Sequence, residues 1–174
     1  MQTIGVAIAI PEPYATELRD HRASFGDPQA DLIPTHVTLL PPTVVDPDEI
    51  DDVEEHLHEV SGRHRSFRMH LRGTATFRPV SPVVFVAVTE GISACEVLAN
   101  AVRSGRLDQE LSFPYHPHVT VAHHLDDSTL DKAFDALADF DVTFDVEEFH
   151  LYTHGDDGVW RPYRSFALAT PAGA

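Results

Sequence analysis

Two short motifs of the same three residues point to acid–base chemistry on a phosphate. His36-Val37-Thr38 and His118-Val119-Thr120 lie 82 residues apart. Both lie in apolar runs typical of strands, where residues two apart point to the same face. Each strand therefore presents an imidazole and a hydroxyl together, with its valines on the apolar side. One imidazole can take a proton from water while the other gives one to a leaving oxygen, and the hydroxyls can bind phosphate oxygens.

The elements around the motifs follow the same order in both halves of the chain. Apolar runs predict strands, amphipathic patterns predict helices, and each motif strand lies between two helices. In the first half we expect strand 3–10, helix 13–24, strand 35–40 closed by Pro41-Pro42, a helix from Asp46 that Gly62 ends, and strand 67–77. In the second we expect strand 83–88, a helix with Ala94, Val97, Leu98, Ala101 and Val102 on one face, strand 117–122, a helix capped near Asp126, strand 142–153, the turn Gly155–Gly158 and strand 159–169.

A common offset near 82 residues relates the matching elements and indicates an internal duplication. We expect two pseudo-symmetric lobes, approximately 1–80 and 81–174, which can exchange strands. Such a pair brings the motif strands side by side across a cleft. Residues 67–77 alternate, which predicts a half-exposed strand. Its apolar face holds Phe67, Met69, Leu71, Ala75 and Phe77, and its polar face holds Arg68, His70, Arg72, Thr74 and Thr76.

Charge restricts the partners that this protein can bind. The 174 residues include 28 Asp and Glu against 12 Lys and Arg, for a net charge of −16 with neutral histidines. Duplex DNA or an anionic membrane surface needs a broad basic face, so neither is expected as a partner. A local cationic pocket for one phosphate stays compatible with this composition. A small nucleotide or an RNA terminus therefore fits better than a long strand.

The motifs and their flanks resemble the two-histidine (2H) phosphoesterase superfamily, in its 2′-5′ RNA ligase and cyclic phosphodiesterase branch. The H-x-T-x signature reads His36 to Leu39 and His118 to Val121, with Leu40-Pro41-Pro42 after the first and Phe113 to Pro117 before the second. The resemblance implies a bilobal α+β fold with two antiparallel sheets lining a central cleft and helices outside. It also implies hydrolysis of 2′,3′-cyclic phosphates or 2′-5′ linkages, with reversible ligation possible in vitro.

The resemblance implies roles for four residues. His36 and His118 become the acid–base pair, and Thr38 and Thr120 bind the phosphate. With O3′ as the leaving atom, His118 activates water and His36 protonates O3′, in a reaction that needs no metal or other cofactor. Further substrate contacts are expected from Tyr115, Arg161 and Tyr163, and the other candidates for charge or stacking are Arg78, Arg164, Phe77 and Trp160.

Two other readings stay open. The chain can be a non-catalytic nucleotide-binding module of the same fold, although both motifs are intact. It can also be a metal-dependent hydrolase, because His116, His123 and His124 supply further imidazoles. His150 and His154 lie about 13 Å apart on a strand, too far to hold one ion together.

The remaining features favour a cytoplasmic monomer. The first residues have no basic region before a short apolar run, so no signal peptide or membrane span is expected. Cys95 is the single cysteine, which excludes an intrachain disulfide, and we expect it to be buried. Lys132 is the single lysine and lies within a predicted helix, so no nucleotidyl-transfer lysine motif is present and any ligation would be ATP-independent.

Overall fold

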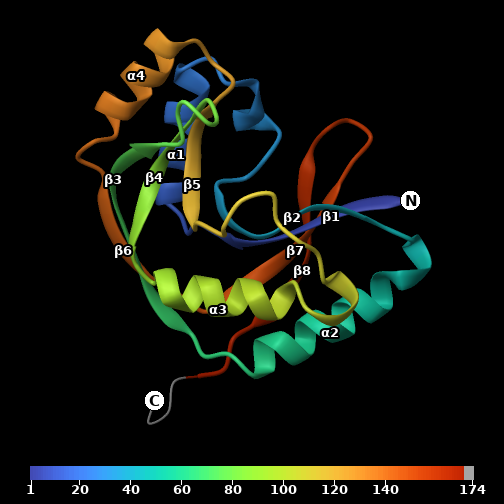
Figure 1. Cartoon of the computed structure of the whole chain (residues 1–174). Coiled ribbons are helices and arrows are strands. Elements are labelled where there is room, and N and C mark those ends of the chain that lie inside the picture. Colours follow the sequence, from blue (N-terminus) through green and yellow to red (C-terminus); the bar gives the residue numbers. More distant parts are fainter. Residues whose placement is uncertain (171–174) are drawn as a thin grey trace.

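The computed structural model describes residues 1–170, which form two four-stranded antiparallel sheets with helices packed against them (Figure 1). The first sheet has the order β2-β1-β7-β8, and the second has the order β5-β4-β3-β6. This α+β architecture confirms the predicted fold class. The strands are β1 (Gln2–Ala9), β2 (His36–Val45), β3 (Phe67–Thr76), β4 (Val83–Glu90), β5 (His118–His123), β6 (Asp141–Val146), β7 (Glu148–His154) and β8 (Trp160–Ala167).

The four helices lie at opposite ends of the molecule in two pairs. α1 (Tyr14–Ser24) and α4 (Asp127–Ala136) pack against the second sheet, and α2 (Ile50–Gly62) and α3 (Ile92–Val102) pack against the first (Figure 1). Each half of the chain therefore covers the other half's sheet with one helix. Asp126 caps α4 by accepting a hydrogen bond from the backbone nitrogen of Thr129 at 2.8 Å, as its residue type predicts.

Strands also cross between the sheets. β3 follows the first motif in sequence but pairs between β4 and β6, and β7 and β8 return to pair beside β1. The prediction of one strand over 142–153 was wrong, because this stretch forms β6 and β7, which belong to different sheets. Both parts are suited to strands, and Glu147 between them gives no turn signal. The sequence pattern therefore hides the change of sheet.

A bulge in β3 reverses which side chains share a face. The pairing passes from Leu71–Val88 to Thr74–Val86, so β3 carries one extra residue there, and Gly73 has a φ of +70°. Thr74 then points toward α4, where its hydroxyl donates to the Phe134 carbonyl at 2.7 Å. The predicted common face from Phe67 through Phe77 was therefore wrong, because an extra residue inverts the alternation beyond it.

Two smaller predictions were also wrong. β2 runs through Pro41 and Pro42 to Val45 instead of ending at the prolines. It is an edge strand, where missing N–H donors are tolerated. The buried face of α3 consists of Cys95, Leu98, Ala99 and Val102. Val97 is 56% exposed, so the apolar stripe is rotated from the predicted one, while Cys95 is buried as expected.

Candidate active site

The two motif strands are edge strands that face each other across the two sheets. β2 begins at His36 and β5 begins at His118, and the strands lie in contact. The side chains of Val37 and Val119 are fully buried, whereas the histidines and threonines are partly exposed, as the alternation predicts. The fold therefore brings both motifs to one region between the sheets.

The same irregularity follows the threonine of each motif. In β2, Thr38 and Leu40 pair with adjacent residues of β1, so Leu39 is the extra residue of a bulge. In β5, Thr120 and Ala122 pair with adjacent residues of β4, so Val121 is the extra residue. A bulge bends its strand and redirects the side chains beside it. Both strands therefore leave the site with the same local backbone distortion.

Backbone carbonyls orient both imidazoles in the same way. His36 Nδ1 lies 2.7 Å from the Pro34 carbonyl oxygen, and His118 Nδ1 lies 2.7 Å from the His116 carbonyl oxygen. A carbonyl only accepts, so Nδ1 carries the proton in each neutral ring. Nε2 of each ring then keeps its lone pair and is the atom available to a substrate.

Burial lowers the pKa of both histidines and so favours their neutral forms. Desolvation lowers the pKa of His36 to about 4, with smaller contributions from the positive charges of Arg22 and His118, while the bond to Pro34 acts in the opposite direction. Desolvation also lowers the pKa of His118, with contributions from His116 and His123.

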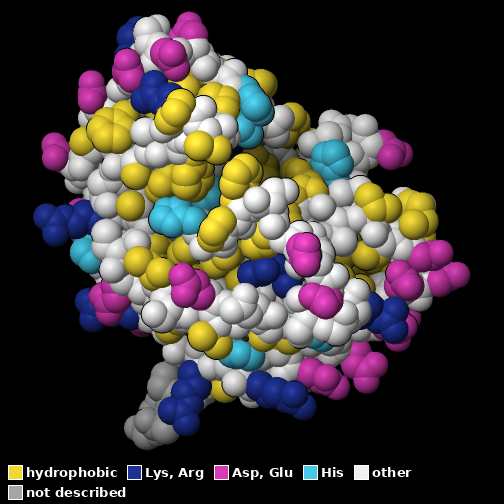
Figure 2. Space-filling view, viewed as in Figure 1, with side chains coloured by type: hydrophobic (Ala, Val, Ile, Leu, Met, Phe, Trp, Pro, Cys, Tyr) yellow, Lys and Arg dark blue, Asp and Glu magenta, His cyan; other side chains and the backbone are white. Residues whose placement is uncertain are grey.

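Two hollows meet at Thr38. A narrow hollow of about 50 Å³ lies on the His36 side, and a groove of about 400 Å³ lies on the His118 side; Thr38 lines both. The narrow hollow is lined by Gly5, Val6, Ala7, Ile33, Pro34, His36, Thr38, Leu40, Pro42, Tyr152 and Trp160. In Figure 2, hydrophobic side chains are numerous near the middle of the face shown, histidines are scattered over it, and acidic side chains are most numerous toward its edges.

Tyr115 connects the groove to the first motif. Its hydroxyl donates to the backbone carbonyl of Thr38 at 2.7 Å, and Arg103 lies over its ring at 5.5 Å. Burial raises the pKa of Tyr115, so its hydroxyl stays a donor at neutral pH. This hydrogen bond uses the backbone carbonyl of Thr38 and leaves its side-chain hydroxyl free. Among residues 1–170, the hydroxyl groups of Thr38 and Thr120 donate no hydrogen bond.

Aromatic rings surround the second histidine. Phe77 and Phe85 meet the His118 ring edge to face at 5.0 and 5.2 Å, and His116 stacks beside it at 6.3 Å. Phe77 reaches this position because of the bulge at Gly73. Phe77 was predicted to stack on a base of the substrate. In the structure it packs against the His118 ring and helps to desolvate it.

Arg22 is a buried cation that the sequence reasoning missed. Its side chain is 9% exposed and its Nε donates to Asp27 Oδ2 at 2.8 Å; Asp27 also accepts from the backbone nitrogen of His123 at 3.0 Å. Among residues 1–170 this is the single hydrogen bond of the guanidinium, and its charge reaches both His36 and His123. The sequence could have indicated this burial, because Arg22 lies four residues after the apolar Leu18 and so shares its face of α1, which is buried.

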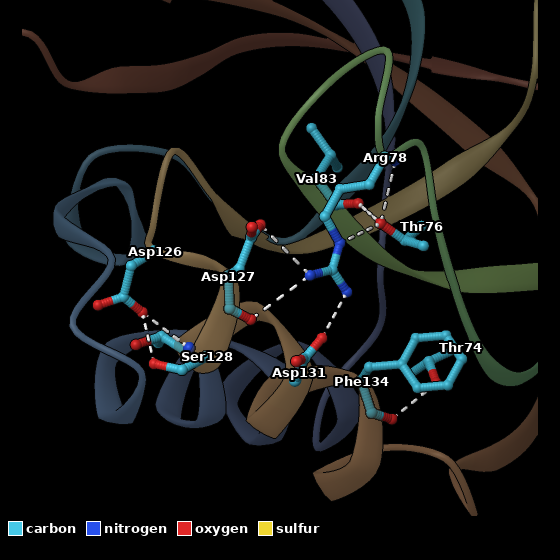
Figure 3. Close-up of polar contacts among 10 residues, drawn as sticks. Thr74, Thr76, Arg78, Val83, Asp126, Asp127, Ser128, Asp131 and Phe134 are labelled. Atoms are coloured by element: carbon cyan, nitrogen blue, oxygen red, sulfur yellow. Dashed lines mark hydrogen bonds and ion pairs between the residues drawn. The ribbon is translucent and has the colours of Figure 1, made fainter.

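Carboxylates neutralise the three arginines proposed from the sequence. Arg78 is held against α4 by Asp127 at 3.6 Å and Asp131 at 3.0 Å, and its Nε donates to the Thr76 hydroxyl (Figure 3). Arg161 pairs with Asp157 in the β7–β8 hairpin, and Arg164 pairs with Glu54 of α2. None of these arginines lines either hollow.

The aromatic candidates are divided between the two sides of the site. Trp160 lines the narrow hollow and packs on Gly5, where an added Cβ would lie 3.3 Å from the ring. Tyr115 lines the groove. Tyr163 is half exposed beside Arg164 and lines neither hollow. Of the three predicted substrate contacts, the structure therefore brings Tyr115 alone to the motifs.

Within residues 1–170, no three His, Cys, Asp or Glu side chains lie together in a way that can hold an ion. No helix over the same range is both long and apolar enough to cross a bilayer.

Comparison with known proteins decides the family. The model of the 2′-5′ RNA ligase superfamily matches residues 10–158, which include both motifs and the elements between them. The chain belongs to this superfamily. A Bacillus licheniformis protein named "Putative phosphoesterase" is 32% identical over 163 residues, covering 92% of this chain and 96% of the relative. A Bacillus cereus protein of the same description is 26% identical over 144 residues, covering 82% and 83%.

Solved structures agree with the superfamily fold. E. coli LigT in complex with 3′-AMP matches with a TM-score of 0.71 at 22% identity, covering 97% of this chain and 98% of LigT. A Thermus thermophilus protein matches with a TM-score of 0.63 at 22% identity and the same coverage. At this identity the structural matches show a common fold. The family model and the 32% identical relative confirm the superfamily resemblance read from the motifs.

Proposed function

We propose that this protein hydrolyses 2′,3′-cyclic phosphates at nucleotide or RNA ends, or related 2′-5′ linkages, by paired-histidine catalysis without a metal. The observation that carries the proposal is the matched presentation of His36 and His118. Each ring is fixed through Nδ1 by a carbonyl two residues upstream, and each keeps Nε2 for a substrate. Membership of the 2′-5′ RNA ligase superfamily supports the reaction class, and the nucleotide held by E. coli LigT supports the substrate class.

The reaction balances with two protons in motion. Water attacks phosphorus, one imidazole Nε2 takes the water proton, the P–O3′ bond breaks, and the other imidazolium gives its proton to O3′. The product is a 2′-phosphate with a free 3′-hydroxyl. When a 5′-hydroxyl attacks phosphorus in place of water, the same two proton transfers form a 2′-5′ linkage, and cleavage of that linkage is the reverse of this second reaction. Thr38 and Thr120 donate hydrogen bonds to the non-bridging oxygens, where charge accumulates in the transition state.

The order of the two histidines stays a prediction. The sequence-based assignment makes His118 the base and His36 the acid. The low pKa of His36 favours the opposite order, because a neutral ring is ready to act as a base. A bound phosphate anion raises the pKa of both rings, so the protonation state of the complex decides the order.

Arg22 supplies the fixed positive charge in this proposal. Its guanidinium makes one hydrogen bond, through Nε, so its two terminal nitrogens have no partner among residues 1–170. Arg22 itself lines neither hollow, and the proposal has these nitrogens donate to the phosphate from beside His36. Asp27 acts as a positioning residue, since it binds Arg22 and the end of β5 together. We place this activity in a cytoplasmic monomer that acts on RNA ends.

The test offers 2′,3′-cyclic nucleotides to the wild type, His36→Ala and His118→Ala in the presence of EDTA, with products separated by chromatography. We expect wild-type turnover to a 2′-nucleotide that survives EDTA, with both variants reduced by about a thousandfold. Turnover that stops in EDTA and returns with zinc would favour the metal-dependent hydrolase. Nucleotide binding without turnover would favour the non-catalytic module.

A further inference from the structure

The groove on the His118 side is larger than a reacting phosphate needs. It occupies about 400 Å³, within the range of sites that hold drug-sized ligands. It starts at Thr38 and His118 and continues along the segment that precedes β5. A third hollow of about 520 Å³ shares Arg103 and Phe113 with the groove and continues past Asn100. The depression therefore leads from the motifs outward along one path.

Arg103 has unused hydrogen-bonding capacity in this groove. Its Nε is buried and has no hydrogen-bond partner, and a terminal nitrogen donates to the Asn100 side chain at 3.1 Å. Among residues 1–170 no carboxylate lies within ion-pair distance of it, although the exposed Glu110 lines the same groove. Nε is closed off from the groove, but the terminal nitrogens are accessible and make no ion pair within the described residues, so they can donate to an anion bound there.

Phe113 gives the groove an exposed aromatic ring. Its side chain is 66% exposed, which is unusual for phenylalanine, and it lines both parts of the depression with Pro114 and Tyr115. One face of the Tyr115 ring is already covered by Arg103. Phe113 is thus the ring that remains open for a planar ligand group, and a nucleobase stacks on such a ring whatever its sequence.

We infer that the groove from Arg103 to Phe113 binds the last-but-one nucleotide of an RNA 3′ end, with its phosphate on Arg103 and its base on Phe113. This inference rests on the proposed function and narrows its substrate class. The preferred substrate is then a short RNA end and not a free cyclic mononucleotide. The net charge of −16 keeps the bound part short, because a longer strand meets acidic surface beyond the groove.

The test compares adenosine 2′,3′-cyclic phosphate with a trinucleotide that ends in the same cyclic phosphate. We expect the wild type to have a kcat/KM at least tenfold higher on the trinucleotide. Arg103→Met and Phe113→Ala should each lose most of that advantage and keep the wild-type rate on the mononucleotide. Arg106→Met is the matched control, since Arg106 pairs with Glu49 and Asp52 outside the groove.

The salt dependence of binding distinguishes a phosphate contact of Arg103 from a purely structural role, because a structural role would leave this dependence unchanged. Loss of one phosphate contact should reduce the slope of log affinity against log salt by about 0.7 for Arg103→Met, and leave it unchanged for Phe113→Ala. Equal wild-type kcat/KM on both substrates, or equal losses on both in the variants, would overturn the inference and leave the proposed function standing.

If neither substrate is cleaved, the proposed function is wrong. A separate binding experiment then still tests the groove. Fluorescence anisotropy then measures the affinity for a labelled trinucleotide that ends in a 2′-phosphate. Binding that weakens about tenfold in Arg103→Met and Phe113→Ala, and not in Arg106→Met, supports the groove as a nucleotide site. Identical affinity in all four proteins overturns it.

Discussion

The two sides of the candidate site present the same atoms in different surroundings. On both sides an edge strand begins at histidine, a carbonyl two residues upstream holds Nδ1, and a bulge follows the threonine. The His36 side is tight, beside a hollow of about 50 Å³ and the buried Arg22. The His118 side opens on a groove of about 400 Å³ and is packed by two phenylalanines.

The comparison shows that the backbone setting of the two histidines is the same, whereas the charge, volume and aromatic content around them differ. In the proposed reaction, two proton-transfer groups need the same tautomer and the same access to one phosphate, which accounts for their matching backbone settings. The charge, volume and aromatic content around each ring set its pKa and the part of the substrate it meets. Substitutions on one side of the site can therefore be compared with substitutions on the other side.

The largest effect is expected from removing both histidines. Each of His36→Ala and His118→Ala should lower kcat by about a thousandfold, since both proton transfers belong to one reaction. The double variant should be scarcely slower than either single variant, because groups that act as a unit are not additive. Steady-state kinetics on a cyclic nucleotide measures this, and fully multiplicative losses would show that the two sides act separately.

The next effect is on stability at acidic pH. The pKa of His36 is about 4 in the folded protein against an ordinary value of 6.5. The unfolded chain then binds more protons between these values, so stability is fully present above pH 6.5 and is lost as pH falls toward 4. The loss amounts to about 3 kcal/mol.

Urea unfolding of the wild type and His36→Gln from pH 7 to pH 4 measures this loss. His36→Gln should show a shallower decline in the free energy of unfolding. The exposed His58→Gln on α2 is the control and should follow the wild type. A His36→Gln curve parallel to the wild type would remove the claim that His36 is held neutral.

Arg22→Met tests the charge on the first side. We expect kcat/KM to fall about 10- to 100-fold, as a charged hydrogen bond to phosphate is lost. The pKa of His36 should rise because a neighbouring positive charge is gone. NMR titration of the ring protons measures the pKa, and circular dichroism checks the fold, since Asp27 is left unpaired.

Arg19→Met on the same helix is the control for this change. Arg19 is half exposed and pairs with Asp31 away from both histidines. It should change neither the rate nor the pKa of His36. Equal effects of the two substitutions would assign the loss to α1 as a whole and would count against a phosphate contact.

The smallest effect is expected at the threonines. Thr38→Val and Thr120→Val keep the shape of each side chain and remove its hydroxyl, so each should lower kcat/KM about tenfold. The two losses should be of similar size, because the bulges place both hydroxyls alike. A loss confined to one variant would show that the phosphate is held from one side.

The sequence predicted most of the fold, because apolar periodicity reports burial directly. The helices and the starts of both motif strands were placed within a few residues, whereas β2 runs five residues beyond its predicted end. Local pattern failed where an extra residue inverts the alternation, as at Gly73, and where the chain changes sheets, at Glu147. A glycine inside a strand, as at Gly73, is itself a sign of a bulge and was not used. Glu147 carries no such signal, so only the pairing of strands reveals the change of sheet.

The site was predicted in part for a related reason. Identical motifs identified His36 and His118, since the repeat is visible in the chain itself. Arg22 was missed because the predicted cations, Arg78, Arg161 and Arg164, all lie on or next to predicted strands, whereas Arg22 lies on a predicted helix. Its partner Asp27 and its neighbour His123 come together only through the packing of α1 against β5. Charge supplied across two elements leaves little trace in sequence.

The central claim is that two imidazole Nε2 atoms converge on one phosphate. NMR titration of the ¹⁵N-labelled imidazoles with a 2′-nucleotide, the expected product, tests it most directly. The account predicts that the Nε2 signals of His36 and His118 both shift, with one saturation curve, and that the pKa of each ring rises on binding. A response from one ring alone, or from neither, would contradict it.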